Sequence, residues 1–133
     1  MVTSMVYLID TNVIIRFFVG NEQDKDYNKS VQIISEIEQG MLQVEILSEV
    51  AMEVIFVMTK FYKSPLDKIA LGLKELILLD GVVNKNKYIL VNTIDMMVEK
   101  NIDFVDALIC SKAKLQNYGK ISFDKDVVNK CER

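Results

Sequence analysis

The sequence contains no histidine and only two cysteines. Without histidine the chain cannot form a His-based catalytic triad, use a histidine general base or build most kinds of zinc site. Cys110 and Cys131 stand far apart without a CxxC pattern, so neither a zinc knuckle nor a redox motif is indicated. A reducing environment is the simplest interpretation of this cysteine usage, and we predict a cytoplasmic location.

Long apolar runs and an excess of basic charge are also missing. No uncharged apolar stretch reaches the roughly 18 residues of a membrane span. Asp10, Asn12 and Arg16 interrupt the apolar N-terminal segment, which argues against a signal peptide. The net charge of −3 argues against a generally basic nucleic-acid-binding surface. It does not exclude a nucleic-acid enzyme, because metal ions and local lysine patches can neutralise phosphate.

What the sequence does contain is an ordered pattern of apolar segments. Half of the 133 residues are apolar, which is enough to bury a core, and the length fits one domain, 1–133. Short apolar runs at 6–9, 44–47 and 121–124 favour buried strands, and segments such as 65–79 between them have helical spacing. Strands separated by helices predict an α/β fold with a central parallel sheet.

Asp10 directly follows the first predicted strand, in the stretch YLIDTN. Ligands of open α/β sheets bind at the carboxyl ends of strands, so a carboxylate here is a candidate site residue. The alternative is that Asp10 caps the following helix, and its position alone supports both interpretations equally.

Glu53 is an isolated acid in the run VAMEVIFVM, which is apolar on nearly every face. Such a helix predicts burial on several sides. A buried carboxylate without a partner costs several kcal/mol, and no basic residue lies within one helical turn. We therefore expect a metal ion, or alternatively a lysine or arginine from elsewhere, to compensate Glu53, and we favour the metal.

Asp106 and Asp124 complete a set of four acids in apolar surroundings. Asp106 lies inside the helical run FVDALIC, three residues after Asp103, which is a natural N-cap. Asp124 ends the last predicted strand, as Asp10 ends the first. Two such strands would bring carboxylates together, and their repulsion would raise a pKa or recruit a divalent cation. An all-oxygen site suits Mg²⁺ or Mn²⁺ and the hydrolysis of phosphodiesters.

Four segments of the chain together resemble the successive motifs of PIN domains. They are YLIDTN (7–12), AMEVIFV (51–57), DFVDALI (103–109) and SFDKD (122–126). The resemblance extends over nearly the whole chain and is closest to small VapC-type toxins. It implies a single PIN-like domain with a three-layer α/β/α fold, in which helices flank the central parallel β-sheet. It also implies a Mg²⁺- or Mn²⁺-dependent endoribonuclease that cleaves RNA phosphodiester bonds by a metal-activated water.

The same resemblance assigns roles to individual residues. The four motif acids are the implied catalytic and metal-binding residues: Asp10, Glu53, Asp106 and Asp124. Asp124 occupies the most variable of these positions in the family. The implied supporting residues are Thr11, Asn12, Ser122 and Asp126. Contacts to RNA are expected from basic groups near the sheet edge, with a solvated surface charge as the alternative for each: Arg16, Lys112 and Lys125.

VapC-type toxins dimerise and are neutralised by a co-encoded antitoxin, so the resemblance implies a homodimer and a VapB-type antitoxin. Helices 48–62 and 65–79 are candidate surfaces for these partners, with plain core packing as the alternative. Two further functions stay open: a non-catalytic PIN-like module that binds RNA or protein, and an RNA-processing nuclease without an antitoxin. An Asp-nucleophile phosphatase fits poorly, because Asn12 stands where its Asp-x-Asp pattern requires a second acid.

Overall fold

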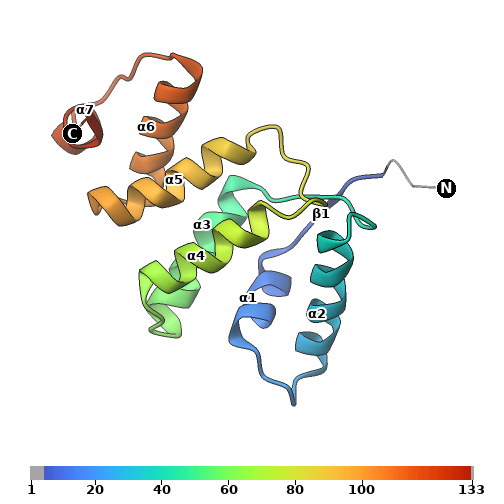
Figure 1. Ribbon diagram of the computed structural model, residues 1–133. Helices are drawn as coiled ribbons and strands as arrows, with labels where there is room; N and C mark the ends of the chain where they lie inside the picture. Colours follow the sequence, from blue (N-terminus) through green and yellow to red (C-terminus); the bar gives the residue numbers. More distant parts are fainter. Residues whose placement is uncertain (1–4, 133) are drawn as a thin grey trace. The chain divides into compact units, whose positions relative to one another are not determined.

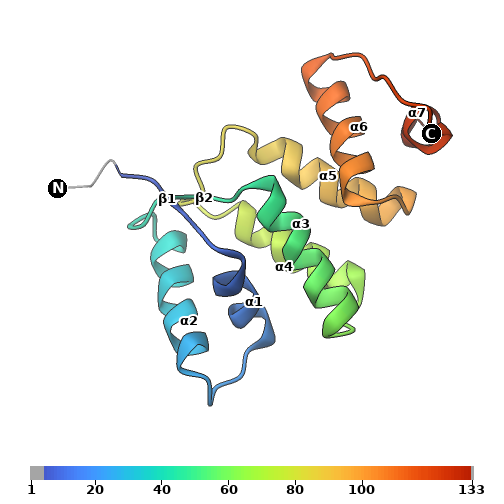
Figure 2. The same cartoon turned by 180° about the vertical axis from the view of Figure 1, so that it is seen from behind.

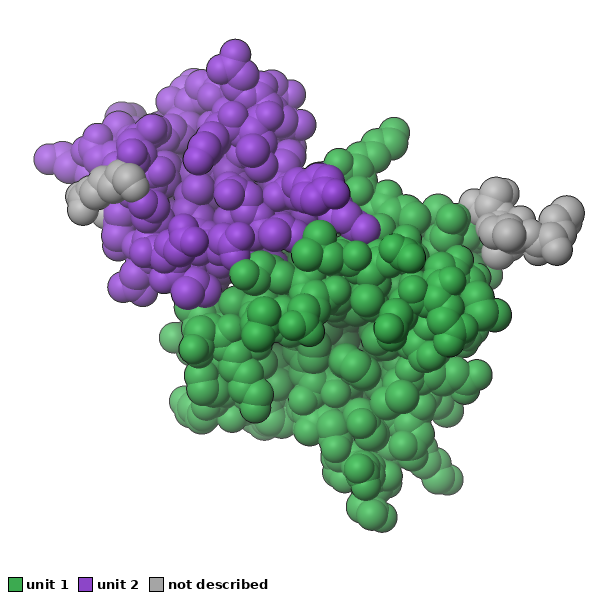
Figure 3. Space-filling view, viewed as in Figure 1, with its two compact units in different colours: residues 1–85 green, residues 86–133 purple. Residues whose placement is uncertain are grey.

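The computed structural model describes residues 5–132, apart from the side chain of Asp126. The chain divides into two compact units, Met1–Lys85 (unit 1) and Asn86–Arg133 (unit 2), which Figure 3 distinguishes by colour. The α/β class and the parallel sheet expected from the sequence are confirmed, whereas the assignment of residues 1–133 to one domain stays a prediction.

The sheet lies in unit 1 and is short. Strands β1 (Tyr7–Leu8) and β2 (Val44–Glu45) pair in parallel, with Tyr7 opposite Val44. A third extended segment adds to the other edge of β2, where Val82 forms a parallel bridge with Val44. The apolar run at 6–9 and the one at 44–47 thus both contribute strands, as predicted.

One side chain continues the sheet where the third segment leaves it. Asn84, which is 7% exposed, accepts a hydrogen bond from the Ile46 amide (2.8 Å) and donates one to the Ile46 carbonyl (2.6 Å). The turn before it needs glycine at position 81, because a Cβ atom there would lie 2.5 Å from the Ile37 carbonyl oxygen. Both residues therefore fix the path of the chain along β2.

Helices surround this sheet in unit 1, and Figures 1 and 2 show α1 beside α2 and α3 beside α4. Their bounds are α1 (Thr11–Val19), α2 (Lys25–Glu38), α3 (Ser48–Phe56) and α4 (Leu66–Ile77), and the π-helical segment η1 (Val57–Phe61) continues α3. α1 packs against both α2 and α3, and α4 packs against α3. Fully buried side chains from these helices, together with Ile46 just after β2, form the core of unit 1: Ile14, Ile37, Ile46, Leu73 and Ile77.

Unit 2 is helical. Helix α5 (Lys87–Lys100) packs against α6 (Phe104–Gln116), and the short α7 (Lys125–Val128) and η2 (Lys130–Glu132) follow. A disulfide joins Cys110 of α6 to Cys131 of η2, with the two Cα atoms 6.2 Å apart. This bond differs from the reduced cysteines that the sequence predicts, because Cys110 and Cys131 form no recognisable motif and only the fold brings them together. No described helix has both the length and the apolar character needed to cross a membrane.

The strand predicted at 121–124 is wrong. These residues have no strand structure, and the side chains of Ile121 and Phe123 are fully exposed. The backbone instead turns, because the amide of Asp124 donates a hydrogen bond to the Ser122 hydroxyl (2.9 Å) before α7 begins. The apolar residues that suggested a strand have no described surface to pack on.

Candidate active site

Asp10 lies just after β1 and caps α1. Its backbone is extended, and its Oδ1 accepts a hydrogen bond from the Thr11 amide at 2.8 Å. The side chain is exposed, and it forms no ion pair with a described residue. Because one capping bond uses one carboxylate oxygen, the second oxygen can still bind a cation. The two interpretations of Asp10, helix cap and site residue, are therefore compatible.

The two residues after Asp10 have different environments. Thr11 is 5% exposed and packs at the start of α1, whereas Asn12 is exposed. The capped helix fixes where both side chains lie, because its first turn is held by the Asp10 hydrogen bond and its end by Gly20 in the left-handed conformation (φ 71°).

The burial predicted for Glu53 is wrong. Glu53 lies on an exposed face of α3, together with Met52 and Phe56, while Ala51 and Val54 face the core. The apolar composition of this helix suggested burial on all sides, but only one face has neighbours that cover it. Glu53 therefore needs no compensating cation. Its assignment as a candidate site residue depends on its place in the motif AMEVIFV (51–57) and not on burial.

Asn12 and Glu53 line the same groove. It lies between α1 and the continuous segment formed by α3 and η1, has a volume of about 650 Å³, and also includes Arg16. We refer to it as the α1–η1 groove. The groove thus brings together three residues expected from the sequence, all within unit 1. Glu53 is expected as a metal ligand, Asn12 as a supporting residue and Arg16 as an RNA contact.

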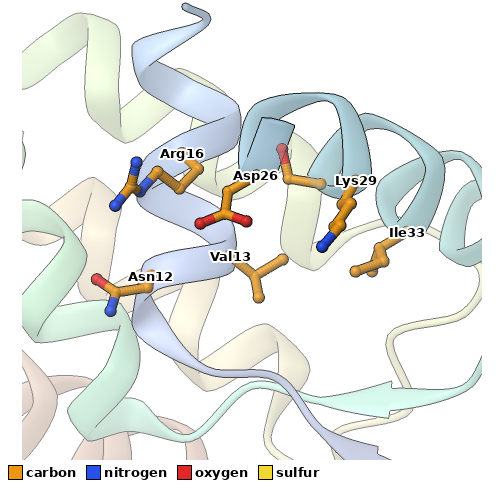
Figure 4. Close-up of a pocket in the computed structure, with 7 residues that line it drawn as sticks. Asn12, Val13, Arg16, Asp26, Lys29 and Ile33 are labelled. Atoms are coloured by element: carbon orange, nitrogen blue, oxygen red, sulfur yellow. The ribbon is translucent and has the colours of Figure 1, made fainter. Parts of the chain in front are cut away.

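A second, smaller cleft of about 290 Å³ lies on the other side of α1, where α2 packs (Figure 4). Asn12 and Arg16 line this cleft too, opposite Asp26 and Lys29 of α2. Arg16 also donates a hydrogen bond to Asp24 (2.6 Å), which lowers the pKa of the Asp24 carboxyl and raises the pKa of the guanidinium. The Arg16 head group is therefore positioned at the start of α2.

Asp106 and Asp124 belong to unit 2. Asp106 lies in the first turn of α6 and is half-buried, three residues after Asp103 at the N-cap position. Asp124 precedes α7 and is exposed, and the hydroxyl of Ser122 accepts a hydrogen bond from its amide. Ser122 therefore orients the turn that carries Asp124. The side chain of Asp126 lies outside the described residues.

The remaining basic residues expected to contact RNA are both exposed. Lys112 lies on α6 and Lys125 begins α7, and neither is ion-paired with a described side chain. Both positions are compatible with a phosphate contact and equally with a solvated charge. Their assignment to RNA binding stays a prediction.

The four acids fit a hard divalent cation in the chemistry of their donors. Mg²⁺ and Mn²⁺ prefer carboxylate oxygens, and Mg²⁺ usually takes only one or two carboxylates beside water and phosphate oxygens. Asp10 and Glu53 supply such oxygens in unit 1, and Asp106 and Asp124 supply them in unit 2. Within either unit, no group of three or more acidic or cysteine side chains comes together among the described residues.

Several residues of the α1–η1 groove were missed by the sequence analysis. Beyond Glu53 the groove is lined by aromatic and basic side chains: Phe56, Lys60, Phe61 and Tyr62. The signal for them is present in FVMTKFYK (56–63), where lysines alternate with aromatic residues after an apolar helix. The sequence alone predicts a helical partner surface or core for this segment, because helical spacing does not distinguish an exposed aromatic face from a buried one.

A parallel sheet flanked by helices, with an acid just after its first strand, defines an open α/β protein, a class in which ligands generally bind at the carboxyl ends of the strands. The model of the PIN domain matches residues 7–132. The chain therefore belongs to the PIN domain family, whose members are generally metal-dependent nucleases. No curated protein and no solved structure matches the chain significantly.

Proposed function

We propose that this protein is a divalent-metal-dependent endoribonuclease. The observation that carries the proposal is the PIN-domain match over residues 7–132, which includes all four acids predicted from the sequence. The exposed carboxylate of Asp10, which follows β1 and has one oxygen outside its capping bond, supports the same function.

In this proposal the residues that would hold the cation are the four acids predicted from the sequence, Asp10, Glu53, Asp106 and Asp124. A bound divalent cation neutralises charge on the phosphate and lowers the pKa of a water molecule. Two side chains of the α1–η1 groove would orient the substrate. Asn12 offers an amide donor in the groove that Glu53 also lines, and Arg16 offers a guanidinium to a phosphate. No histidine or free nucleophilic side chain is needed for this chemistry.

Replacing Asp10 with asparagine separates its two roles. Asparagine caps helices about as well as aspartate, so the free energy of unfolding should change by less than about 1 kcal/mol. Loss of a metal ligand removes several kcal/mol of charge stabilisation, so Mg²⁺- or Mn²⁺-dependent cleavage of single-stranded RNA should fall by about 100-fold or more. Gel electrophoresis of end-labelled RNA and urea denaturation measure the two effects.

Asp67→Asn is the matched control. Asp67 is also exposed, also lies at the start of a helix, and accepts a hydrogen bond from the next amide, that of Lys68, at 3.0 Å. This substitution should leave cleavage unchanged. Wild-type activity in Asp10→Asn, or full activity of the natural protein in saturating EDTA, would contradict the proposal.

The second candidate function is a PIN-like module that binds RNA or protein without cutting. It is favoured by one observation, the lack of a three-acid group within either unit among the described residues. Calorimetric titration with Mn²⁺ discriminates between the two functions. Binding that Asp106→Asn abolishes favours the nuclease, whereas no binding by the natural protein favours the module.

We further propose that the nuclease is the toxin of a type II pair, acting in the cytoplasm as a homodimer that a VapB-type antitoxin neutralises. The resemblance to VapC-type toxins motivates this step, and two exposed leucines about two helical turns apart, Leu71 on α4 and Leu78 at its C-cap, support a partner surface there. A short antitoxin-like reading frame directly upstream of the gene would agree with the proposal. Without such a frame, RNA processing becomes the better assignment.

A further inference from the structure

The α1–η1 groove has a composition that the metal site does not require. Beside Asn12 and Glu53 it carries three aromatic side chains and two cationic ones. Phe61 is 75% exposed, Phe56 is 63% exposed and Tyr62 is 44% exposed, so their ring faces are open to a ligand. Aromatic residues of this size are normally covered in a folded protein, and three of them in one groove indicate a binding surface.

The π-helical geometry of η1 places these rings together. The Tyr62 amide donates to the Val57 carbonyl (3.2 Å), which is an i→i+5 bond and adds one residue to the turn. Phe56 and Phe61 are five positions apart, and an α-helix would put them on different faces. With the wider turn both line the groove. Such π-helical turns are uncommon and occur frequently at functional sites.

The end of η1 is held in an unusual backbone conformation. Lys63 has a φ of 58°, a left-handed value that is rare for residues with a side chain. The next amide, that of Ser64, donates to the Met58 carbonyl (2.9 Å) and closes the segment. Phe61 and Tyr62 pack edge to face just before this point, with ring centroids 4.9 Å apart. The two rings are therefore positioned by the fold and do not depend on a ligand for their arrangement.

The charges of the groove suit a polyanion. Lys60 is exposed and forms no ion pair with a described residue. Arg16 presents its guanidinium at the same groove while one nitrogen bonds to Asp24. Asp24 offsets the charge of Arg16, so Lys60 is the groove cation that no described acid pairs, beside the single acid of the lining, Glu53. Proteins that bind single-stranded nucleic acid combine such cations with aromatic rings on which bases stack.

We propose that the α1–η1 groove binds one or two nucleotides of single-stranded RNA beside Glu53, with a base stacked on Phe61 and a phosphate on Lys60. The groove volume, about 650 Å³, lies within the roughly 300–1,000 Å³ typical of sites for small molecules of this size. As a substrate-binding site the groove rests on the proposed nuclease function, but its affinity for RNA is measured separately from cleavage.

The chain has no tryptophan, so Phe61→Trp introduces a single reporter into the groove. The test uses this substitution in the Asp10→Asn background with EDTA present, so that no RNA is cut. A short single-stranded RNA should quench the tryptophan emission in a saturable titration, because a stacked base quenches the ring. Phe61→Leu keeps the apolar bulk but removes the stacking face. Its affinity for a labelled copy of the same RNA should be about 5- to 150-fold weaker.

Lys60→Gln tests the phosphate contact. It should reduce the slope of log affinity against log salt by about 0.7, the value for one contact to a single strand. The matched controls are Lys68→Gln on α4 and Tyr7→Leu on β1, which change an exposed lysine and an exposed tyrosine outside the groove. Both controls should leave the affinity and the salt slope unchanged.

Lack of quenching, or equal RNA affinity in Phe61→Leu and its parent, would overturn the inference. So would occupation of the groove by a second copy of the chain. In that case the tryptophan emission would change with protein concentration alone, and Phe61→Leu would shift sedimentation to the monomer without altering RNA affinity. Quenching by RNA in a protein that fails to cleave RNA with any metal would reject the nuclease function and leave the groove assignment intact.

Discussion

Asn84 offers a sharp test of how the sheet is held, because its amide replaces a strand partner. The carbonyl oxygen of the amide accepts from the Ile46 N–H and its NH₂ group donates to the Ile46 carbonyl, in a site where Asn84 is 7% exposed. Asn84→Asp keeps the shape and the acceptor. The ionised carboxylate, however, cannot donate to the Ile46 carbonyl. Only the protonated acid can reproduce both bonds.

The expected magnitude follows from the cost of keeping that acid protonated. An aspartate has an ordinary pKa of about 3.9, and each pH unit above it costs about 1.36 kcal/mol if the carboxyl must stay neutral. The loss of stability relative to the natural protein should therefore approach about 4 kcal/mol at pH 7 and fall to about 1.5 kcal/mol at pH 5. Folding raises the pKa of this aspartate, so the free energy of unfolding of Asn84→Asp falls as the pH rises and recovers as the pH is lowered.

Urea denaturation followed by circular dichroism at several pH values measures this difference, with equal m-values as the check that unfolding stays two-state. Asn84→Ala serves as the comparison, because it leaves the Ile46 groups without the amide at every pH. Its loss should be about 2–4 kcal/mol and independent of pH. A loss in Asn84→Asp that is the same at pH 5 and pH 7 would refute the hydrogen-bonding role assigned to the Asn84 amide.

Two further predictions concern stability. Gly81→Ala should lower the free energy of unfolding by about 1–3 kcal/mol in urea, because the new Cβ would lie 2.5 Å from the Ile37 carbonyl oxygen and the backbone must move. Gly119→Ala, with nothing within 4 Å, is the control and should change it little. Asp24→Asn removes the carboxylate whose pKa Arg16 lowers. The natural protein should therefore have a higher melting temperature than Asp24→Asn at neutral pH. The difference should vanish in strong acid, where Asp24 is protonated. A difference that stays constant with pH would contradict the Arg16–Asp24 ion pair.

The sequence predicted the local elements of unit 1 well, because their signals are local. Asp10 and Gly20 mark the two ends of α1, and the structure shows both as caps. The apolar spacing of α4 likewise matches the residues that α4 buries, such as Leu73 and Ile77. Caps and periodicity depend on a few neighbouring residues, so they can be identified without knowledge of the fold.

The errors share a different cause, which is that a sequence does not say what covers an apolar face. Glu53 was expected to be buried because α3 is apolar all round, yet Phe56 on the same helix is 63% exposed. Phe123 suggested a core strand and is fully exposed. The exposed aromatic groove was missed for the same reason. Tertiary neighbours decide between core and surface, and in this chain the proposed RNA-binding groove uses residue types that are common in protein cores.

Helix α1 is shared by two surfaces, since Asn12 and Arg16 line both the α1–η1 groove and the cleft against α2. Substitutions at these two positions are therefore pleiotropic: each alters two sites at once, and a compensating change must satisfy both. Lys60 and Lys29 each belong to one surface only. Selection for a new ligand specificity can thus change Lys60 or Lys29 and affect one surface alone. A change at Asn12 or Arg16 of α1 affects both surfaces.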